Sequence, residues 1–200
     1  MKGPSIVTGA DGIPRCAWAG SAADYLDYHD REWGVPVRGE TALFERLTLE
    51  AFQSGLSWLT ILRKRPAFRQ AFAGFDAEVV AGFGADDRAR LLADVGIVRN
   101  ARKIDAAIRN ARAVLALRAE GGLDALVWSH VPPRHARPAG LAELVASSPE
   151  STALSKALKA RGFAHLGPTT LYAAMQACGL VDDHLAGCHR AGSASTRTGG

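Results

Sequence analysis

Two pairs of one cysteine and one histidine lie near opposite ends of the chain. Twelve residues separate Cys16 from His29, and His184 and Cys188 belong to the stretch His-Leu-Ala-Gly-Cys, whose spacing fits one helical turn. Two thiolates and two imidazoles are the ligand set of a closed, tetrahedral zinc site. The sequence therefore predicts one structural Zn²⁺ ion held by these four residues, which requires the two ends of the fold to meet.

The cysteines and histidines also permit alternative roles. The four residues could occur together by chance, His189 could replace a neighbouring ligand, and Cys178, in an apolar run, is expected to be a core thiol. Three cysteines are too few, and odd in number, for a disulfide framework. Since the N-terminus also lacks the apolar run of a signal peptide, we expect a cytoplasmic protein whose thiols stay unpaired.

Composition indicates one globular unit with a substantial core, because 48% of the 200 residues are apolar and 22% are charged. No stretch approaches the roughly 20 apolar residues of a membrane span, so we expect no membrane partner. A formal net charge of +4 permits a polyanionic partner without requiring one. The basic residues form three groups: Arg63, Lys64, Arg65 and Arg69; Arg99, Arg102, Lys103, Arg109 and Arg112; and Lys156, Lys159 and Arg161.

Apolar residues recur mostly at helical spacing, and no convincing strand alternation is present, so the sequence predicts an all-α fold. We expect helices over 40–54, 76–82, 86–94, 100–119, 150–161 and 168–178.

The remaining segments predict connections and flexible ends. Residues 1–14 are expected to be a flexible leader, and 190–200, which lack apolar periodicity, a disordered tail. The prolines of residues 130–140 forbid a continuous helix, and they indicate a surface connection between two lobes. We therefore expect one compact domain over 15–189.

Glu50 is the first candidate for chemistry. It follows Leu43 and Leu47 on the stripe of the predicted helix that otherwise faces the core. A carboxylate is costly to bury unless it is paired or hydrogen-bonded, and such groups often belong to functional sites. The alternative is that Glu50 lies at the edge of the stripe and reaches water.

Aromatic residues surround the predicted ligand His29 in sequence. Tyr25, Tyr28 and His29 would share one side of a helix, and Trp18 lies between Cys16 and this segment. Together with Trp58 these rings and Glu50 would form an aromatic slot with one acceptor. Packing in the core is the alternative for each ring.

Two helical patterns meet at a tight turn around Gly96, within residues 91–104, and Arg99, Arg102 and Lys103 follow at once. A helix-hairpin-helix presents backbone N–H groups and a helix N-terminus to a phosphate in this way. A solvated helix face is the alternative. It applies equally to Lys156 and Lys159.

Taken together, these residues resemble the 3-methyladenine DNA glycosylase I family of bacterial alkylation repair, over roughly residues 14–189 and in collinear order. The matching stretches are Arg15-Cys-Ala-Trp18, Tyr28-His-Asp-Arg-Glu-Trp-Gly-Val-Pro36, Leu49-Glu-Ala-Phe-Gln-Ser-Gly-Leu-Ser-Trp58, Gly96-Ile-Val-Arg99 with Lys103-Ile, Leu154-Ser-Lys-Ala-Leu-Lys-Ala-Arg-Gly-Phe163, and Met175-Gln-Ala-Cys-Gly-Leu-Val-Asp-Asp-His184.

The resemblance implies a helix-hairpin-helix glycosylase fold with a zinc-binding lobe that joins the N- and C-terminal segments. It implies zinc bound by the two Cys/His pairs. It also implies a base pocket in which Glu50 and Tyr28 make polar contacts. The pocket aromatics that would pack around or stack on the base are Trp18, Tyr25 and Trp58.

The implied activity is excision of 3-methyladenine from double-stranded DNA. The enzyme, expected to be a monomer, would flip the base out and hydrolyse its N-glycosidic bond. No second carboxylate is evident beside Glu50, Asp105 included, and no lysine is an evident Schiff-base nucleophile. The resemblance therefore implies a monofunctional enzyme that leaves an abasic site. The alternatives are a zinc-stapled module that binds damaged DNA without cleaving it, and a metallohydrolase with an open zinc position.

Overall fold

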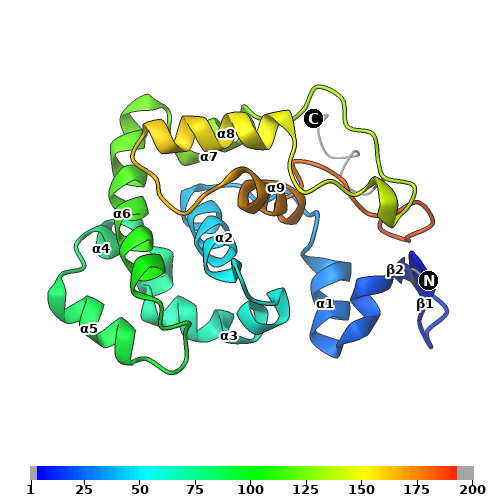
Figure 1. Cartoon of the computed structure of the whole chain (residues 1–200), viewed down its shortest axis with the longest axis horizontal. Coiled ribbons are helices and arrows are strands. Elements are labelled where there is room, and N and C mark those ends of the chain that lie inside the picture. The colour runs from blue at the N-terminus through cyan, green and yellow to red at the C-terminus, as the bar shows by residue number, and fades with distance from the viewer. Residues whose placement is uncertain (1–3, 193–200) are drawn as a thin grey trace.

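The computed structural model describes residues 4–192 and is mostly helical (Figure 1). No helix in this part of the chain is long and apolar enough to cross a membrane. The elements in chain order are β1 (Ile6–Thr8), β2 (Pro14–Cys16), η1 (Ala17–Ser21), α1 (Ala23–Arg31), α2 (Glu40–Gln53), α3 (Trp58–Ala71), η2 (Ala73–Phe75), α4 (Ala77–Ala81), α5 (Ala85–Ala93), α6 (Ala101–Leu117), η3 (Arg118–Glu120), α7 (Gly122–Trp128), η4 (Leu141–Glu143), α8 (Pro149–Ala160) and α9 (Pro168–Ala177).

Each predicted helical segment coincides with a helix of the structure, namely α2, α4, α5, α6, α8 and α9. The sequence did not predict α3, which carries Pro66 in its interior and many basic residues. Proline removes one backbone hydrogen bond and disfavours a helix locally. Burial of Ile61, Leu62 and Phe68 stabilises α3 nevertheless, because tertiary packing outweighs propensity.

Helix α2 occupies the middle of the main core and contacts α3, α6, α7 and α9 (Figure 1). Leu43, Leu49 and Phe52 are among its fully buried side chains. Phe52 packs edge-on against Phe68 of α3, with ring centroids 4.8 Å apart. Because several elements pack around α2, three of its polar residues are buried as well, namely Arg46, Thr48 and Glu50.

The N-terminal segment differs from the flexible leader that the sequence predicted. β1 and β2 form an antiparallel two-stranded sheet in which Ile6 pairs with Cys16. Each strand has three residues, too few to show the alternation by which strands are recognised. The predicted all-α fold therefore contains one small sheet.

Both ends of the described chain meet beside α1, on the right in Figure 1. Cys16, Leu185 and Cys188 form a second, small buried cluster there. The His189 N–H donates to the Pro14 carbonyl (2.9 Å). Residue 192 is the last of this C-terminal segment that the structure describes, so most of the predicted disordered tail lies outside the described residues.

The proline-containing stretch between α7 and η4 is mostly exposed and contains no helix in residues 131–139, as its prolines indicate. It contacts the C-terminal segment, since the Ala186 N–H donates to the Pro138 carbonyl (3.2 Å). The stretch thus connects the helical body to the region where the chain ends meet.

Candidate functional site

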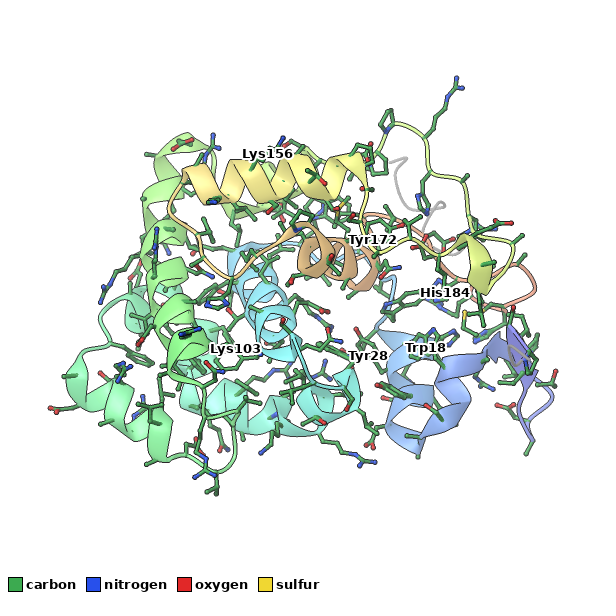
Figure 2. The ribbon with its side chains drawn as sticks, viewed as in Figure 1. Trp18, Tyr28, Lys103, Lys156, Tyr172 and His184 are labelled. Carbon is green, nitrogen blue, oxygen red and sulfur yellow. The ribbon has the colours of Figure 1, made fainter. Side chains whose placement is uncertain are left out.

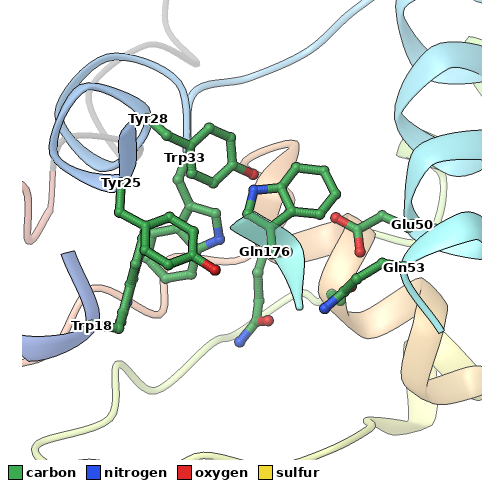
Figure 3. Close-up of a pocket in the computed structure, with 9 residues that line it drawn as sticks. Trp18, Tyr25, Tyr28, Trp33, Glu50, Gln53 and Gln176 are labelled. Atoms are coloured by element: carbon green, nitrogen blue, oxygen red, sulfur yellow. The ribbon is translucent and has the colours of Figure 1, made fainter. Parts of the chain in front are cut away.

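A cavity of about 230 Å³ lies between α1, α2, the start of α3 and α9. It is small compared with the ~300–1,000 Å³ of common ligand pockets. The five residues predicted to form a pocket all line it, although they come from four separate elements (Figure 3). The lining residues are Trp18, Tyr25, Tyr28, Trp33, Glu50, Gln53, Trp58, Ala173 and Gln176.

The aromatic rings form the walls of this cavity. Trp18 meets Tyr25 edge-on, with ring centroids 5.5 Å apart, and Tyr28 and Trp58 lie 5.4 Å apart. The Tyr25 hydroxyl accepts a hydrogen bond from the Leu59 N–H (2.8 Å), at the first turn of α3. This bond attaches α1 to α3, so the rings are held at a fixed separation.

Glu50 supplies the acidic group of the cavity and is only 4% exposed. Burial raises the pKa of its carboxyl from 4.5 to about 8, and the Arg46 guanidinium opposes this rise. Among the residues that the structure describes, none forms a hydrogen bond or an ion pair with this carboxyl group. A buried carboxyl without a partner is a costly arrangement, and it is ready to receive a cation or a hydrogen-bond donor.

Arg46 lies beneath the pocket, with its guanidinium carbon 5.9 Å from the centre of the Tyr28 ring. Its Nη2 donates to Glu32 (2.8 Å), and Arg65 of α3 donates to the same carboxylate (2.7 Å). The hydrogen bonds from Arg65 lower the pKa of Glu32 to about 2, against the effect of burial. Glu32 therefore joins the end of α1 to α2 and α3. The Arg46 guanidinium is ion-paired with Glu32 and not with Glu50.

Four lining residues were not among the predicted site residues: Trp33, Gln53, Ala173 and Gln176. Gln53 lies three positions after Glu50, so the face of α2 could have indicated it. Trp33 packs edge-on against Trp18 (5.3 Å) and the ring of His184 (4.6 Å). Helix α9 has no local sequence signal that places it at the cavity.

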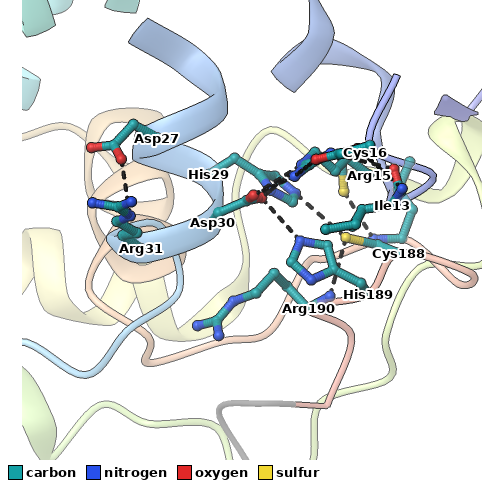
Figure 4. Close-up of polar contacts among 12 residues, drawn as sticks. Ile13, Arg15, Cys16, Asp27, His29, Asp30, Arg31, Cys188, His189 and Arg190 are labelled. Atoms are coloured by element: carbon teal, nitrogen blue, oxygen red, sulfur yellow. Dashed lines mark hydrogen bonds and ion pairs between the residues drawn. The ribbon is translucent and has the colours of Figure 1, made fainter. Parts of the chain in front are cut away.

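The predicted zinc ligands gather next to the aromatic wall. Ligand atoms of Cys16, His29 and Cys188 all lie within 4.8 Å of one another (Figure 4). The Cys188 Sγ atom is 3.4 Å from His29 Nε2. The Leu185 N–H donates to the Cys16 sulfur (3.4 Å), and all three side chains are buried.

His184, the fourth predicted ligand, is not among the three residues whose ligand atoms lie within 4.8 Å of one another, but its ring packs against that of His29. Its ring centroid is 5.2 Å from that of His29. Its Nδ1 lies 2.9 Å from the Asp182 carboxylate, which can accept from it and leaves Nε2 as the nitrogen available to a metal. That Nε2 is buried without a hydrogen-bond partner. A buried imidazole nitrogen without a partner, on a ring that packs against His29, suits a fourth ligand of a tetrahedral metal site.

Carboxylates orient both imidazoles. Asp30 lies 2.7 Å from His29 Nδ1, which directs Nε2 toward the sulfurs. Arg15 donates to Asp30 (2.7 Å), as does His189 Nε2 (2.9 Å). Although burial raises it, the hydrogen bonds from Arg15 and the histidines hold the pKa of Asp30 well below its usual range. His189 thus contacts the Asp30 carboxylate. Cys178, as expected, lies in the main core.

Helices α5 and α6 are joined by a short connection that contains Gly96. The Asn100 side chain caps α6 by accepting from the Lys103 N–H (3.2 Å). The Lys103 ammonium is used within the fold, because it donates to the carbonyls of Phe52 (2.7 Å) and Ser54 (2.6 Å) at the end of α2. Among the described residues Arg99 and Arg102 have no ion-pair partner, and both are exposed.

The other basic residues are distributed differently from the three sequence groups. Arg63, Arg65, Arg69 and Arg161 form ion pairs, and Lys64, Arg109 and Arg112 donate to backbone carbonyls. Lys156 lies on α8, away from the pocket residues Trp18 and Tyr28 (Figure 2). Asp105 pairs with Arg88 (2.6 Å) at the surface, and it does not line the cavity.

A model of the methyladenine glycosylase family matches residues 18–191. DNA-3-methyladenine glycosylase 1 of Escherichia coli strain K12 is 46% identical over 180 residues, which are 88% of this chain and 96% of that protein. A crystal structure of 3-methyladenine DNA glycosylase I superposes with a TM-score of 0.84 at 46% identity, covering 88% of this chain and 98% of that chain.

A further solved structure contains a ligand. It is a Tyr-to-Phe variant of 3-methyladenine DNA glycosylase I in complex with 3-methyladenine, with a TM-score of 0.82 at 37% identity, covering 88% of this chain and 96% of that chain. The match to the family model spans most of the sequence. The chain therefore belongs to the methyladenine glycosylase family and is a DNA glycosylase.

Proposed function

We propose that this protein removes 3-methyladenine from double-stranded DNA by hydrolysing the N-glycosidic bond and releasing the free base. The observation that carries this proposal is Glu50, a buried carboxyl group without a partner in a small aromatic cavity. Such a pocket suits a flat ligand that brings a positive charge or a donor. The complex of a related glycosylase with 3-methyladenine supports this choice of ligand.

The chemistry follows from the charge of the substrate. Methylation at N3 makes the adenine of a nucleotide cationic, so the base is already a good leaving group. A cation in the pocket favours the ionised form of Glu50, which then stabilises the charged base in surroundings of low dielectric. The faces of Trp18 and Trp58 add cation–π attraction.

Tyr28 assists as a donor in this proposal. Burial raises the pKa of its hydroxyl far above the usual value, and the nearby Glu50 adds to the rise. The phenol therefore stays protonated, and it can donate a hydrogen bond to a ring nitrogen of the base. Tyr28 and Glu50 together would recognise an acceptor and a donor on one purine edge.

Double-stranded DNA must give up the damaged nucleotide before the base can enter the cavity. A base weakened in stacking or pairing costs less to flip, which contributes selectivity. We propose that the α5–α6 turn acts as a helix-hairpin-helix that binds the phosphate backbone through backbone N–H groups at the start of α6. The exposed side chains of Arg99 and Arg102 would add charge there.

The proposed reaction has neither a second catalytic carboxylate nor a covalent intermediate. Asp105 is paired with Arg88 at the surface. Lys103 donates to two backbone carbonyls, so its amine is not presented to a substrate. We therefore propose a monofunctional enzyme that leaves an abasic site.

The cysteines and histidines next to the aromatic wall fit a zinc ion. We propose that Cys16, His29, His184 and Cys188 hold one. Four protein ligands fill a tetrahedral coordination sphere, so the ion would supply structure and no activated water. The proposed role is to hold the segment that carries Trp18, Tyr25 and Tyr28 against the helical body.

One experiment separates this function from a module that binds damaged DNA without cleaving it. Purified protein is incubated with DNA treated with a methylating agent, and the released bases are identified by chromatography and mass spectrometry. We expect free 3-methyladenine in stoichiometric excess over the protein. Tight binding of methylated DNA with no released base would contradict the proposal and favour the binding module.

A further inference from the structure

A polar network joins the wall of the cavity to the proline-containing stretch, and no step proposed above uses it. The carboxylate of Asp183, which is 3% exposed, lies at its centre. Its Oδ2 accepts from Gln176 Nε2 (2.6 Å) and from the Tyr172 hydroxyl (2.9 Å), and its Oδ1 accepts from His135 Nε2 (2.7 Å). Gln176 and Tyr172 belong to α9, whereas His135 comes from the stretch between α7 and η4.

This network determines which end of the Gln176 amide faces the cavity. An ionised carboxylate can only accept hydrogen bonds, so Gln176 must turn its NH₂ group toward Asp183. The carbonyl oxygen then points away from Asp183, and no residue in the described part of the chain donates a hydrogen bond to it. Gln176 lies among the side chains that line the cavity (Figure 3). Gln176 therefore keeps an acceptor atom without a donor on a side chain that lines the cavity.

We propose that Gln176 is a specificity-determining residue that selects purines with an amino group at C6 over purines with a carbonyl group there. This inference rests on the proposed glycosylase function. The Gln176 carbonyl accepts a hydrogen bond from the 6-amino group of 3-methyladenine. The O6 atom of 3-methylguanine is itself an acceptor, so it would face a second acceptor instead of a donor.

Asp183 is the positioning residue in this arrangement, since it touches the amide and not the base. Its other two partners keep the carboxylate in place, because Tyr172 and His135 donate to it from opposite sides of the network. Both N3-methylated purines are cationic in DNA, so the negative charge of Glu50 attracts both, and Glu50 and Gln176 can each accept one hydrogen of a 6-amino group. A buried acceptor left without a donor typically costs roughly tenfold or more in binding or rate.

Two substitutions test the orientation of the amide. Gln176→Met keeps the length of the side chain and removes the acceptor. Asp183→Asn places an amide NH₂ where Oδ2 accepts now, so the Gln176 side chain is expected to turn around and offer its own NH₂ to the cavity. The asparagine oxygen can still accept from His135, and its NH₂ group can donate to the Tyr172 oxygen.

The measured quantity is the ratio of kcat/KM for 3-methyladenine to kcat/KM for 3-methylguanine, on DNA that carries both lesions. We expect Gln176→Met to lower this ratio about tenfold through slower release of 3-methyladenine. Asp183→Asn should lower it further, because release of 3-methylguanine also increases. An unchanged ratio in both variants would overturn the proposal.

Tyr172→Phe is the matched control, since it removes a donor to Asp183 and leaves the Gln176 amide held in the same direction. We expect it to keep the wild-type ratio. If it lowered the ratio as much as Asp183→Asn, general loosening of α9 would be the cause and the proposal would fail. Zinc content and melting temperature are measured for Asp183→Asn, because His184 is its neighbour. A wild-type protein that releases no base contradicts the proposed function itself, which is a distinct result.

Discussion

At the scale of single residues, Glu50 is a buried carboxyl group whose burial is expected to destabilise the folded protein. Its carboxyl is buried in the core-facing part of α2 without a partner among the described residues. A glutamine of the same shape would be cheaper to bury, so stability alone does not explain a glutamate at this position. We propose that its ability to ionise beside a cationic ligand does.

We expect Glu50→Gln to slow release of 3-methyladenine by roughly 100-fold, because the neutral amide cannot supply the negative charge that stabilises the departing base. Base release under single-turnover conditions is the measurement. Glu45→Gln is the matched control on the same helix, since Glu45 pairs with Arg69 outside the cavity. Full activity in Glu50→Gln would exclude the proposed role of this residue.

The same substitution should change how stability depends on pH. The pKa of Glu50 is raised from 4.5 to about 8 in the folded protein, so the folded state binds a proton more tightly than the unfolded state. Its contribution to stability is full below about pH 4.5, declines as the pH rises through about 8, and is then level. We expect the melting temperature of Glu50→Gln to exceed that of the wild type by more at pH about 8.5 than at pH about 5. An equal difference at both values would contradict the raised pKa.

At the scale of elements, the connection between α5 and α6 uses some basic residues within the fold and leaves others exposed. Gly96 lies so close to α3 that a Cβ there would be 2.9 Å from the Ala67 Cβ atom. Lys64 of α3 donates to the Val95 carbonyl (2.8 Å), and Lys103 donates to the end of α2. The turn is thus docked on two helices, and this leaves Arg99 and Arg102 exposed at its surface.

Lys103→Met and Arg102→Met should therefore affect different properties, the first the stability of the fold and the second the binding of DNA. Losing the Lys103 ammonium leaves two carbonyls at the end of α2 with one fewer donor, so we expect the free energy of unfolding to fall by about 1–3 kcal/mol. Arg102→Met should leave stability nearly unchanged and reduce the salt dependence of DNA binding by about one unit of slope. Chemical denaturation and titration of DNA at several salt concentrations measure the two effects. A Lys103→Met protein that is fully stable yet binds DNA weakly would place this lysine at the phosphate backbone.

At the scale of the whole molecule, the Cys/His cluster joins segments from the two ends of the chain. The apolar cluster beneath it is small, with Cys16, Leu185 and Cys188 as its buried members. So small an apolar cluster contributes little stability. The proposed zinc ion would add to the contacts by which Tyr25 and Glu32 attach α1 to the helical body, and α1 carries part of the wall of the cavity.

Cys188→Ser should lose zinc and lower the melting temperature, since metal binding free energy is also folding free energy at such sites. Cys178→Ser, which changes a cysteine in the main core, should keep one zinc ion per chain. Elemental analysis and thermal denaturation compare the two variants. Removal of zinc that abolished turnover while the fold and its stability stayed intact would support a metallohydrolase instead.

The sequence by itself indicated the helices with regular apolar spacing, the two Cys/His pairs and the unusual position of Glu50 on α2. These features are local, because they depend on spacing within a few turns or on residue types that carry their chemistry with them. The spacing of apolar residues did not predict the elements that depend on tertiary packing. Helix α3 forms despite Pro66, and the short strands β1 and β2 form in a segment expected to be flexible.

Only the tertiary structure decided which side chains are free to act. It placed Gln176 at the cavity and turned its amide by way of Asp183, and it used Lys103 to hold the end of α2. Orientation and pairing of this kind depend on contacts between residues far apart in the chain. No local pattern encodes these contacts, because they arise only when the core aligns the helices that carry them.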